Sequence, residues 1–131
     1  MTAELLSSEW VELHATLGVR LPQRPGASAH LRYVVSDKHV VDVQFDVVFV
    51  DGRVVSATLE GEGEPDVVLT SPRAVLVAIV DGALPGQTAL MQGKVKSSAT
   101  GPLLPVLAVL QSSEWRELER AIAADTSPSQ P

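Results

Sequence analysis

The chain of 131 residues contains no cysteine, few aromatic residues and fewer basic than acidic residues. The lack of cysteine excludes disulfides, thiol nucleophiles and thiolate metal sites, and fits a reducing compartment, so we expect a cytoplasmic protein. No apolar run reaches the roughly 18 residues of a membrane-spanning helix, so we expect no stable membrane insertion. The start of the chain lacks the basic and apolar regions of a signal peptide, and none is expected.

The charge and the shortage of aromatic residues exclude further classes of partner. The formal net charge is −6 at pH 7. A surface of this sign repels a phosphate backbone. The aromatic residues are only Trp10, Tyr33, Phe45, Phe49 and Trp115, which leaves no platform for stacked bases or flavins. We therefore expect no nucleic-acid partner and no cofactor.

Aliphatic residues make up most of the hydrophobic content. Hydrophobic residues are 45% of the chain, with 20 valines and 16 leucines. A chain of this length buries about two-thirds of its unfolded surface, which is enough for an aliphatic core. We expect one domain over residues 1–124 and a disordered tail over residues 125–131, where the sequence reads DTSPSQP.

Helical spacing of apolar residues marks both ends of the predicted domain. Between Leu6 and Leu17 the spacing predicts a helix over Ala3–Leu17, and a last helix is predicted over Ser113–Ala123. The motif SSEW occurs near the start of each helix. Serine is a good N-cap and glutamate is favourable in the first turn. We interpret the repeat as two similar helix starts and not as a duplicated domain.

Between these helices the apolar period changes to two. Apolar and polar residues alternate over three segments, Ala27–Val35, Val41–Val50 and Arg53–Glu60. This alternation is typical of strands with one buried face, and Asp51-Gly52 is a two-residue hairpin signal. An antiparallel meander is therefore predicted. Two more strands are predicted over Asp66–Thr70 and Gln92–Ser98.

Two predicted helices, over Ala74–Val80 and Leu103–Leu110, are apolar around most of their circumference. Ser71 and Pro72 are interpreted as the N-cap and first residue of the earlier one, and a short helix is predicted over Pro85–Met91. A helix that is hydrophobic all round must be covered on every side. One sheet face covers one side, so other helices, a second subunit or an apolar ligand must cover the rest.

Candidate catalytic and metal-ligating residues are few. No phosphate loop or GxSxG motif has the required spacing. Asp37, His39 and Asp42 are candidate metal ligands, but their spacing matches no known cage and favours a polar turn. His14 is expected on the polar side of its helix, and His30 on the wetter face of its strand. We expect no catalytic residue and no metal site.

The segment PDVVLTSPRAVLVAIVDGALPGQTALMQGKVKSSATGPLLPVLAVL resembles the C-terminal half of the sterol carrier protein type 2 family, the non-specific lipid-transfer proteins. The resemblance is carried by an acidic residue that opens an apolar strand, a helix that ends near glycine, and a Gly-Lys-x-Lys strand. Here these are Asp66, Gly82 and residues 93–96. The valine- and alanine-rich composition with three lysines is typical of a GC-rich genome, so we expect a bacterial stand-alone member.

The resemblance implies an α+β fold with a five-stranded mixed sheet, an antiparallel meander plus two strands. Helices would cover one face, with an apolar tunnel between the layers. It implies binding and carriage of a fatty acid, acyl-CoA or sterol-like lipid, without chemistry, by a monomer or weak homodimer. The residues expected to line the site are Phe45, Phe49, Val75, Leu76, Ile79, Leu84, Leu90, Met91, Leu103, Leu107 and Leu110.

Two other interpretations remain open at this stage. The same apolar helices could form a protein–protein interaction or dimerisation module. A small α+β enzyme is the third interpretation, although the sequence shows no acid–base set for it.

Overall fold

The computed structural model describes residues 3–37 and 40–127. Its main sheet has the strand order β4-β3-β2-β5-β6. The strands are β2 (Ala29–Asp37), β3 (Val40–Val50), β4 (Arg53–Leu59), β5 (Val67–Pro72) and β6 (Lys96–Ser97). Strands β2, β3 and β4 are antiparallel, β5 runs parallel to β2, and β6 runs antiparallel to β5. The predicted five-stranded mixed sheet is confirmed.

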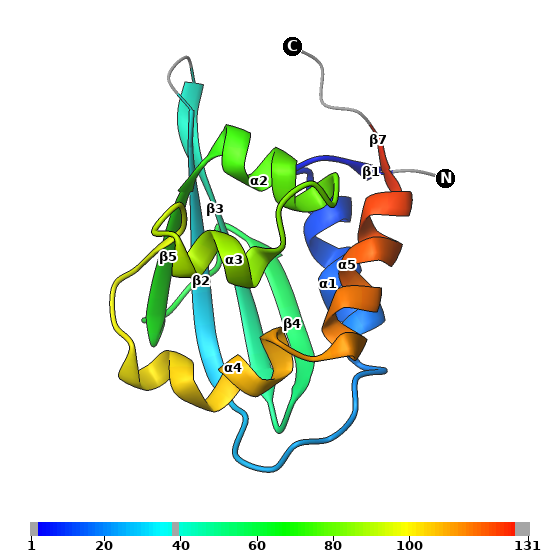
Figure 1. Ribbon diagram of the computed structural model, residues 1–131, viewed down its shortest axis with the longest axis vertical. Coiled ribbons are helices and arrows are strands. Elements are labelled where there is room, and N and C mark those ends of the chain that lie inside the picture. Colours follow the sequence, from blue (N-terminus) through cyan, green and yellow to red (C-terminus); the bar gives the residue numbers. More distant parts are fainter. Residues whose placement is uncertain (1–2, 38–39, 128–131) are drawn as a thin grey trace.

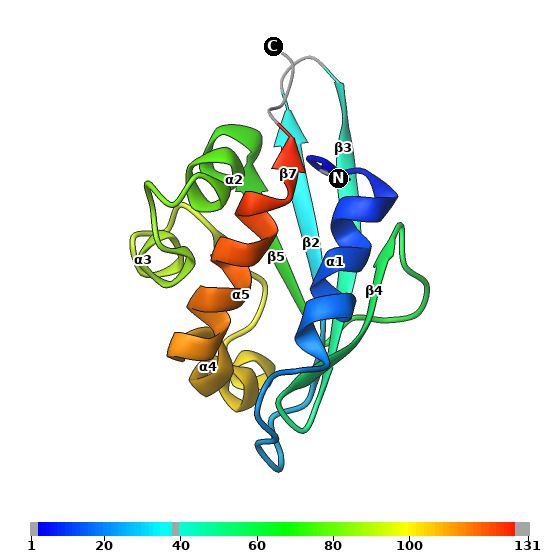
Figure 2. The same cartoon turned by 90° about the vertical axis from the view of Figure 1, so that its right-hand side faces the viewer.

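The helices form a second layer on one face of this sheet (Figures 1 and 2). They are α1 (Ser8–Gly18), α2 (Arg73–Val80), α3 (Gly86–Met91), the 3₁₀ helix η1 (Gly101–Leu103), α4 (Leu104–Leu110) and α5 (Ser113–Ala124). Helix α5 contacts α1, α2 and α4, so it lies at the centre of the layer. The predicted α+β fold with helices on one face is therefore confirmed.

The period-two pattern places the core between these layers. Leu31, Val47, Phe49 and Val67 are buried on the inner face of the sheet. Helix α1 lies directly on β4, because a Cβ at Gly18 would be 2.4 Å from the Cβ of Val54. A glycine at the end of α1 therefore permits the close approach of helix and strand.

The repeated SSEW motif starts both long helices in the same way. Ser7 is the N-cap of α1 and its hydroxyl accepts a hydrogen bond from the Trp10 amide at 3.2 Å. Ser112 caps α5 and accepts from the Trp115 amide, also at 3.2 Å. The interpretation of both motifs as helix starts is confirmed. Because the cap is at Ser7, α1 begins later than predicted.

Two short strands join the start and the end of the described chain. Ala3–Glu4 (β1) pair in parallel with Thr126–Ser127 (β7). The Trp10 indole donates to the Thr126 hydroxyl at 3.1 Å, which ties β7 to α1. A helix from Ala3 was expected, and this is wrong because Ala3 and Glu4 form β1. The disorder expected from residue 125 stays a prediction. The rest of the expected tail, residues 128–131, lies outside the described residues.

Two local predictions need correction. Ser71 is the buried fifth residue of β5, and Pro72 is the N-cap of α2 without a side-chain hydrogen bond. Of the strand predicted over Gln92–Ser98, only the two residues of β6, Lys96 and Ser97, are in the sheet. The amides of Lys94 and Val95 instead donate to the Ala89 carbonyl, so these residues close α3 and do not extend the sheet.

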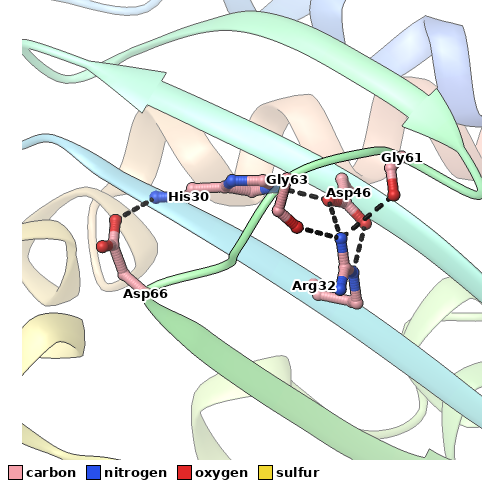
Figure 3. Close-up of polar contacts among 6 residues, drawn as sticks. All are labelled: His30, Arg32, Asp46, Gly61, Gly63 and Asp66. Carbon is pink, nitrogen blue, oxygen red and sulfur yellow. Dashed lines mark hydrogen bonds and ion pairs between the residues drawn. The ribbon is translucent and has the colours of Figure 1, made fainter.

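The outer face of the sheet carries the connection from β4 to β5. These strands are separated by β3 and β2, so residues 60–66 must cross the sheet. Arg32 on β2 holds this crossing loop. Its Nη2 donates to the carbonyls of Gly61 at 3.0 Å and Gly63 at 2.9 Å (Figure 3).

Asp46 on β3 is buried beneath the crossing loop and binds His30 and Arg32 of β2. Its Oδ1 accepts from the Arg32 Nε at 3.0 Å, and its Oδ2 contacts the His30 Nε2 (Figure 3). The His30 amide also donates to Asp66 Oδ2 at 2.8 Å, where the loop enters β5. The outer face is thus wetter than the core, as predicted, but His30 is partly buried in a polar network.

Gly61→Ala should destabilise the protein by about 1–3 kcal/mol, as overpacking does in a filled site. The added Cβ would lie 2.5 Å from the Cγ of Asp46, so the loop or the carboxylate must move. Urea unfolding measures the loss. Gly101→Ala is the control, since a Cβ there meets nothing within 4 Å. Equal stability of the two variants would contradict the tight packing of the loop on Asp46.

Candidate functional site: an apolar cavity between the layers

A cavity of about 140 Å³ lies between the sheet and the helices. We call it the inner cavity. Strands β2, β3 and β5 and all five α-helices of the described chain contribute to its walls. Its lining consists of Trp10, His14, Tyr33, Phe45, Leu69, Ser71, Leu76, Ile79, Val80, Gly86, Leu90, Val95, Leu107, Leu110, Gln111, Trp115, Glu119 and Ile122. Aromatic and aliphatic side chains dominate this set.

The few aromatic residues of the chain are concentrated at the inner cavity. Tyr33 and Phe45, neighbours on β2 and β3, stack with ring centroids 4.8 Å apart and an interplanar angle of 9°. Trp10 from α1 meets Phe45 edge-on at 5.5 Å. Trp115 from α5 completes the aromatic lining. The aromatic rings therefore form a wall to which both layers contribute.

Polar side chains interrupt this apolar wall. His14 donates from Nδ1 to the Val11 carbonyl at 3.1 Å, and burial lowers its pKa to about 4, so the imidazole is neutral at pH 7. Burial raises the pKa of Glu119 to about 7, an effect that Arg116 partly offsets. Burial also raises the pKa of Tyr33, with a further contribution from Glu119. His14 thus faces the cavity, and its expected position on a polar helix side is wrong.

A second cavity of about 420 Å³ adjoins the first one. We call it the outer cavity. It lies among the end of α2, the segment 81–86, α3, α4 and α5, and two arginines, Arg116 and Arg120, are part of its lining. Both cavities are lined by Ile79, Val80, Gly86, Leu110 and Glu119. The two spaces therefore meet along one shared boundary.

The structure places the predicted lining residues in several environments. Six line the inner cavity: Phe45, Leu76, Ile79, Leu90, Leu107 and Leu110. Leu84 lines the outer cavity. Phe49 and Leu103 are buried in the core and line neither cavity, Val75 is half-buried and lines neither, and Met91 is 78% exposed. A role in ligand contact remains a prediction for all eleven.

The predicted lining set omits several residues of the inner cavity, although their helical spacing in the sequence places them on one helix face. Trp10 and His14 are four residues apart and so share one face of α1. On α5, Glu119 lies between Trp115 and Ile122 in the same apolar stripe. A charged residue within an apolar stripe was the signal that could have identified Glu119.

Other kinds of site find no support in residues 3–37 and 40–127. No cluster of at least three His, Asp or Glu side chains in these ranges is arranged to hold a metal ion. The candidate set of Asp37, His39 and Asp42 includes His39, which lies outside the described residues. None of the helices in the same ranges combines the length and the apolar character needed to cross a bilayer.

Sequence comparison decides the family. The model of the SCP-2 sterol transfer family matches residues 20–98, which is more than half of the chain. The chain belongs to the SCP-2 sterol transfer family. Among curated proteins, no sequence matches this one closely enough to count as a relative. Membership of the SCP-2 family indicates lipid binding or transfer in general.

Solved structures show the same SCP-2 fold. A conserved hypothetical protein from Thermus thermophilus has a TM-score of 0.74 at 22% identity, with coverage of 100% of this chain and 97% of that one. A crystal structure of sterol carrier protein 2 gives 0.71 at 21% identity, with 95% and 100% coverage. Palmitated SCP2L2 from Aedes aegypti gives 0.60 at 22% identity, with 81% and 96% coverage. At these identities the likeness establishes the fold.

The raised pKa of Glu119 makes stability depend on pH. The native carboxyl keeps a proton that the unfolded chain releases between pH 4.5 and about 7, so stability falls as pH rises through this window. Glu119→Gln removes this dependence. The variant should gain about 2 kcal/mol over wild type between pH 4.5 and pH 8, after allowance for partial exposure.

Chemical unfolding at a series of pH values measures this difference. His14, whose lowered pKa has the opposite effect on stability in part of the window, is present in both proteins and cancels. Glu117→Gln, an exposed change on the same helix, is the control and should show no such trend. A stability difference between Glu119→Gln and wild type that stays constant with pH would contradict burial of the Glu119 carboxyl.

Proposed function

We propose that the protein binds and carries one apolar ligand, a fatty-acyl chain or a sterol-like lipid, between its helices and its sheet and does no chemistry on it. The inner cavity carries this proposal. An apolar cavity of about 150 Å³ stays dry and accepts a molecule of the size of benzene. The inner cavity, at about 140 Å³, suits a ring or a short part of a chain.

A longer ligand needs the outer cavity as well. Its volume of about 420 Å³ falls in the range of roughly 300–1,000 Å³ typical of small-molecule sites. Complete burial of a twelve-carbon chain gains roughly 10 kcal/mol at about 0.8 kcal/mol per CH₂. Enough of this remains for micromolar binding after the entropy losses of association. Family membership supports the general class of ligand, and the cavity supports the apolar chain.

The empty inner cavity has an energetic cost that a ligand removes. At about 24 cal/mol per Å³, a void of this size lowers stability by about 3 kcal/mol. The lipid-free protein should therefore be less stable than the filled one. The dimerisation interpretation predicts no such gain in stability on addition of lipid, because contact with a second subunit would leave the cavity empty.

Leu107→Trp should fill the inner cavity and abolish stabilisation by ligand, because Leu107 is part of the cavity lining. Lauric acid or dodecanol at a hundred times its dissociation constant should stabilise delipidated wild type by about 2.7 kcal/mol, which raises Tm by about 10 °C. Thermal unfolding with and without ligand is the measurement. Leu104→Trp, on the same helix but 57% exposed, is the control and should respond like wild type. A wild-type Tm that neither lipid moves would refute the proposed function.

Native mass spectrometry of the purified protein should show a monomer that carries lipid-sized adducts, which disappear after delipidation. The reason is that the empty cavity favours any apolar molecule of suitable size. Denaturing mass spectrometry of the same sample supplies the unliganded mass as a control. A ligand-free dimer that persists on dilution would instead favour the interaction module.

A further inference from the structure

Glu119 occupies the boundary between the inner and outer cavities. It lines both of them. Its Oε2 lies 3.5 Å from the position that a Cβ on Gly86 would take, which places the carboxylate between α5 and the start of α3. A ligand whose chain fills the inner cavity and whose end reaches the outer cavity must therefore pass this carboxylate.

Two polar groups that line the inner cavity, Glu119 and Tyr33, have unused hydrogen-bonding capacity. Within residues 3–37 and 40–127, neither the Glu119 carboxylate nor the Tyr33 hydroxyl has a hydrogen-bond or ion-pair partner. Tyr33 lines the inner cavity, and the Glu119 charge acts on its hydroxyl. No fully buried side-chain nitrogen or oxygen in these ranges lacks a partner, so the Glu119 and Tyr33 oxygens are accessible from the cavity space. Carboxyls with a perturbed pKa in a cleft are common at functional sites. A ligand can supply the missing donor.

The surrounding charges do not neutralise Glu119. Arg116 and Arg120 of α5 and Asp81 at the end of α2 line the outer cavity. On the inner side, α1 contributes His14, whose lowered pKa keeps it neutral at pH 7, and β2 contributes Tyr33. From α3 and α4 no charged side chain lines either cavity in the described chain. Burial outweighs the effect of Arg116 on the carboxyl.

We propose that Glu119, with the Tyr33 hydroxyl, selects ligands whose polar end donates a hydrogen bond and carries no negative charge, a long-chain alcohol or amine, over ligands that end in a carboxylate. This inference rests on the proposed function and assigns the head group that the site prefers. An ionised Glu119 accepts a hydrogen bond from a hydroxyl and a stronger, charge-assisted one from an ammonium. It repels a second carboxylate.

The discrimination against ligands that end in a carboxylate should weaken as pH falls. A protonated Glu119 becomes a donor and no longer repels a ligand carboxylate. Its pKa of about 7 places this change between pH 8 and pH 6. A hydroxyl ligand can accept from the protonated form as well as donate to the ionised form. Alcohol binding should therefore change little over the same range.

The experiment compares dodecanol, dodecylamine and laurate, which share one chain length, each below its critical micelle concentration. Displacement of a fluorescent fatty-acid analogue at pH 8 should show dodecanol and dodecylamine binding about tenfold tighter than laurate, as a hydrogen bond to a charged group implies. Glu119→Gln should tighten laurate and weaken dodecylamine, each about tenfold. Tyr33→Phe keeps the ring and should weaken dodecanol about fivefold. Glu117→Gln, exposed on the same helix, is the matched control and should equal wild type.

The outcomes separate this inference from the proposed function. If none of the three lipids binds, the proposed function fails. If all three bind equally and Glu119→Gln changes none of them, apolar carriage stands and head-group selection is refuted. Wild type alone gives a second test that needs no variant to fold. Its affinity for laurate should rise about tenfold from pH 8 to pH 6, and an affinity that does not change would overturn the role of Glu119.

Discussion

The contact of Arg32 with Asp46 and with the crossing loop is the constraint on which the two-layer arrangement depends. Because β4 and β5 lie on opposite sides of the β3–β2 pair, the chain must cross one face of the sheet. Arg32 satisfies two loop carbonyls there, and the buried Asp46 balances its charge. A buried ion pair adds little net stability over an apolar pair, so its main contribution is to define the path of the loop. The inner face is then left to the helices and the cavity.

Most of the sheet could be predicted because its rules are local. Period-two alternation identified the meander, and Asp51-Gly52 forms the predicted hairpin turn with positive φ at both residues. The pairing of β1 with β7 could not be predicted, because its residues lie at opposite ends of the domain and each strand has only two of them. Strand β6 is short because the amides of Lys94 and Val95 donate to the Ala89 carbonyl. The alternation of apolar and polar residues does not predict these hydrogen bonds.

The candidate site was less predictable for a different physical reason. Where a helix is apolar all round, hydrophobicity does not distinguish its faces, so Leu76 and Val75 have the same expected role although only Leu76 lines the inner cavity. Neighbouring Leu90 and Met91 differ in the same way. Polar residues carry more information in such helices. Glu119 interrupts an apolar stripe, and the structure places it in the lining of both cavities, where burial raises its pKa.

Helix capping divides the cavity wall into two kinds of element. Helices α1 and α5 start on serine hydroxyls, whereas α2, α3 and α4 have no side-chain cap within the described residues. Gly82 and Gly93, in the turns that flank α3, have positive φ and open space around them. Amide exchange reports local opening at free energies below that of global unfolding. The wall should thus consist of a slowly exchanging frame, α1 and α5, and a fast-exchanging group of short helices, α2, α3 and α4.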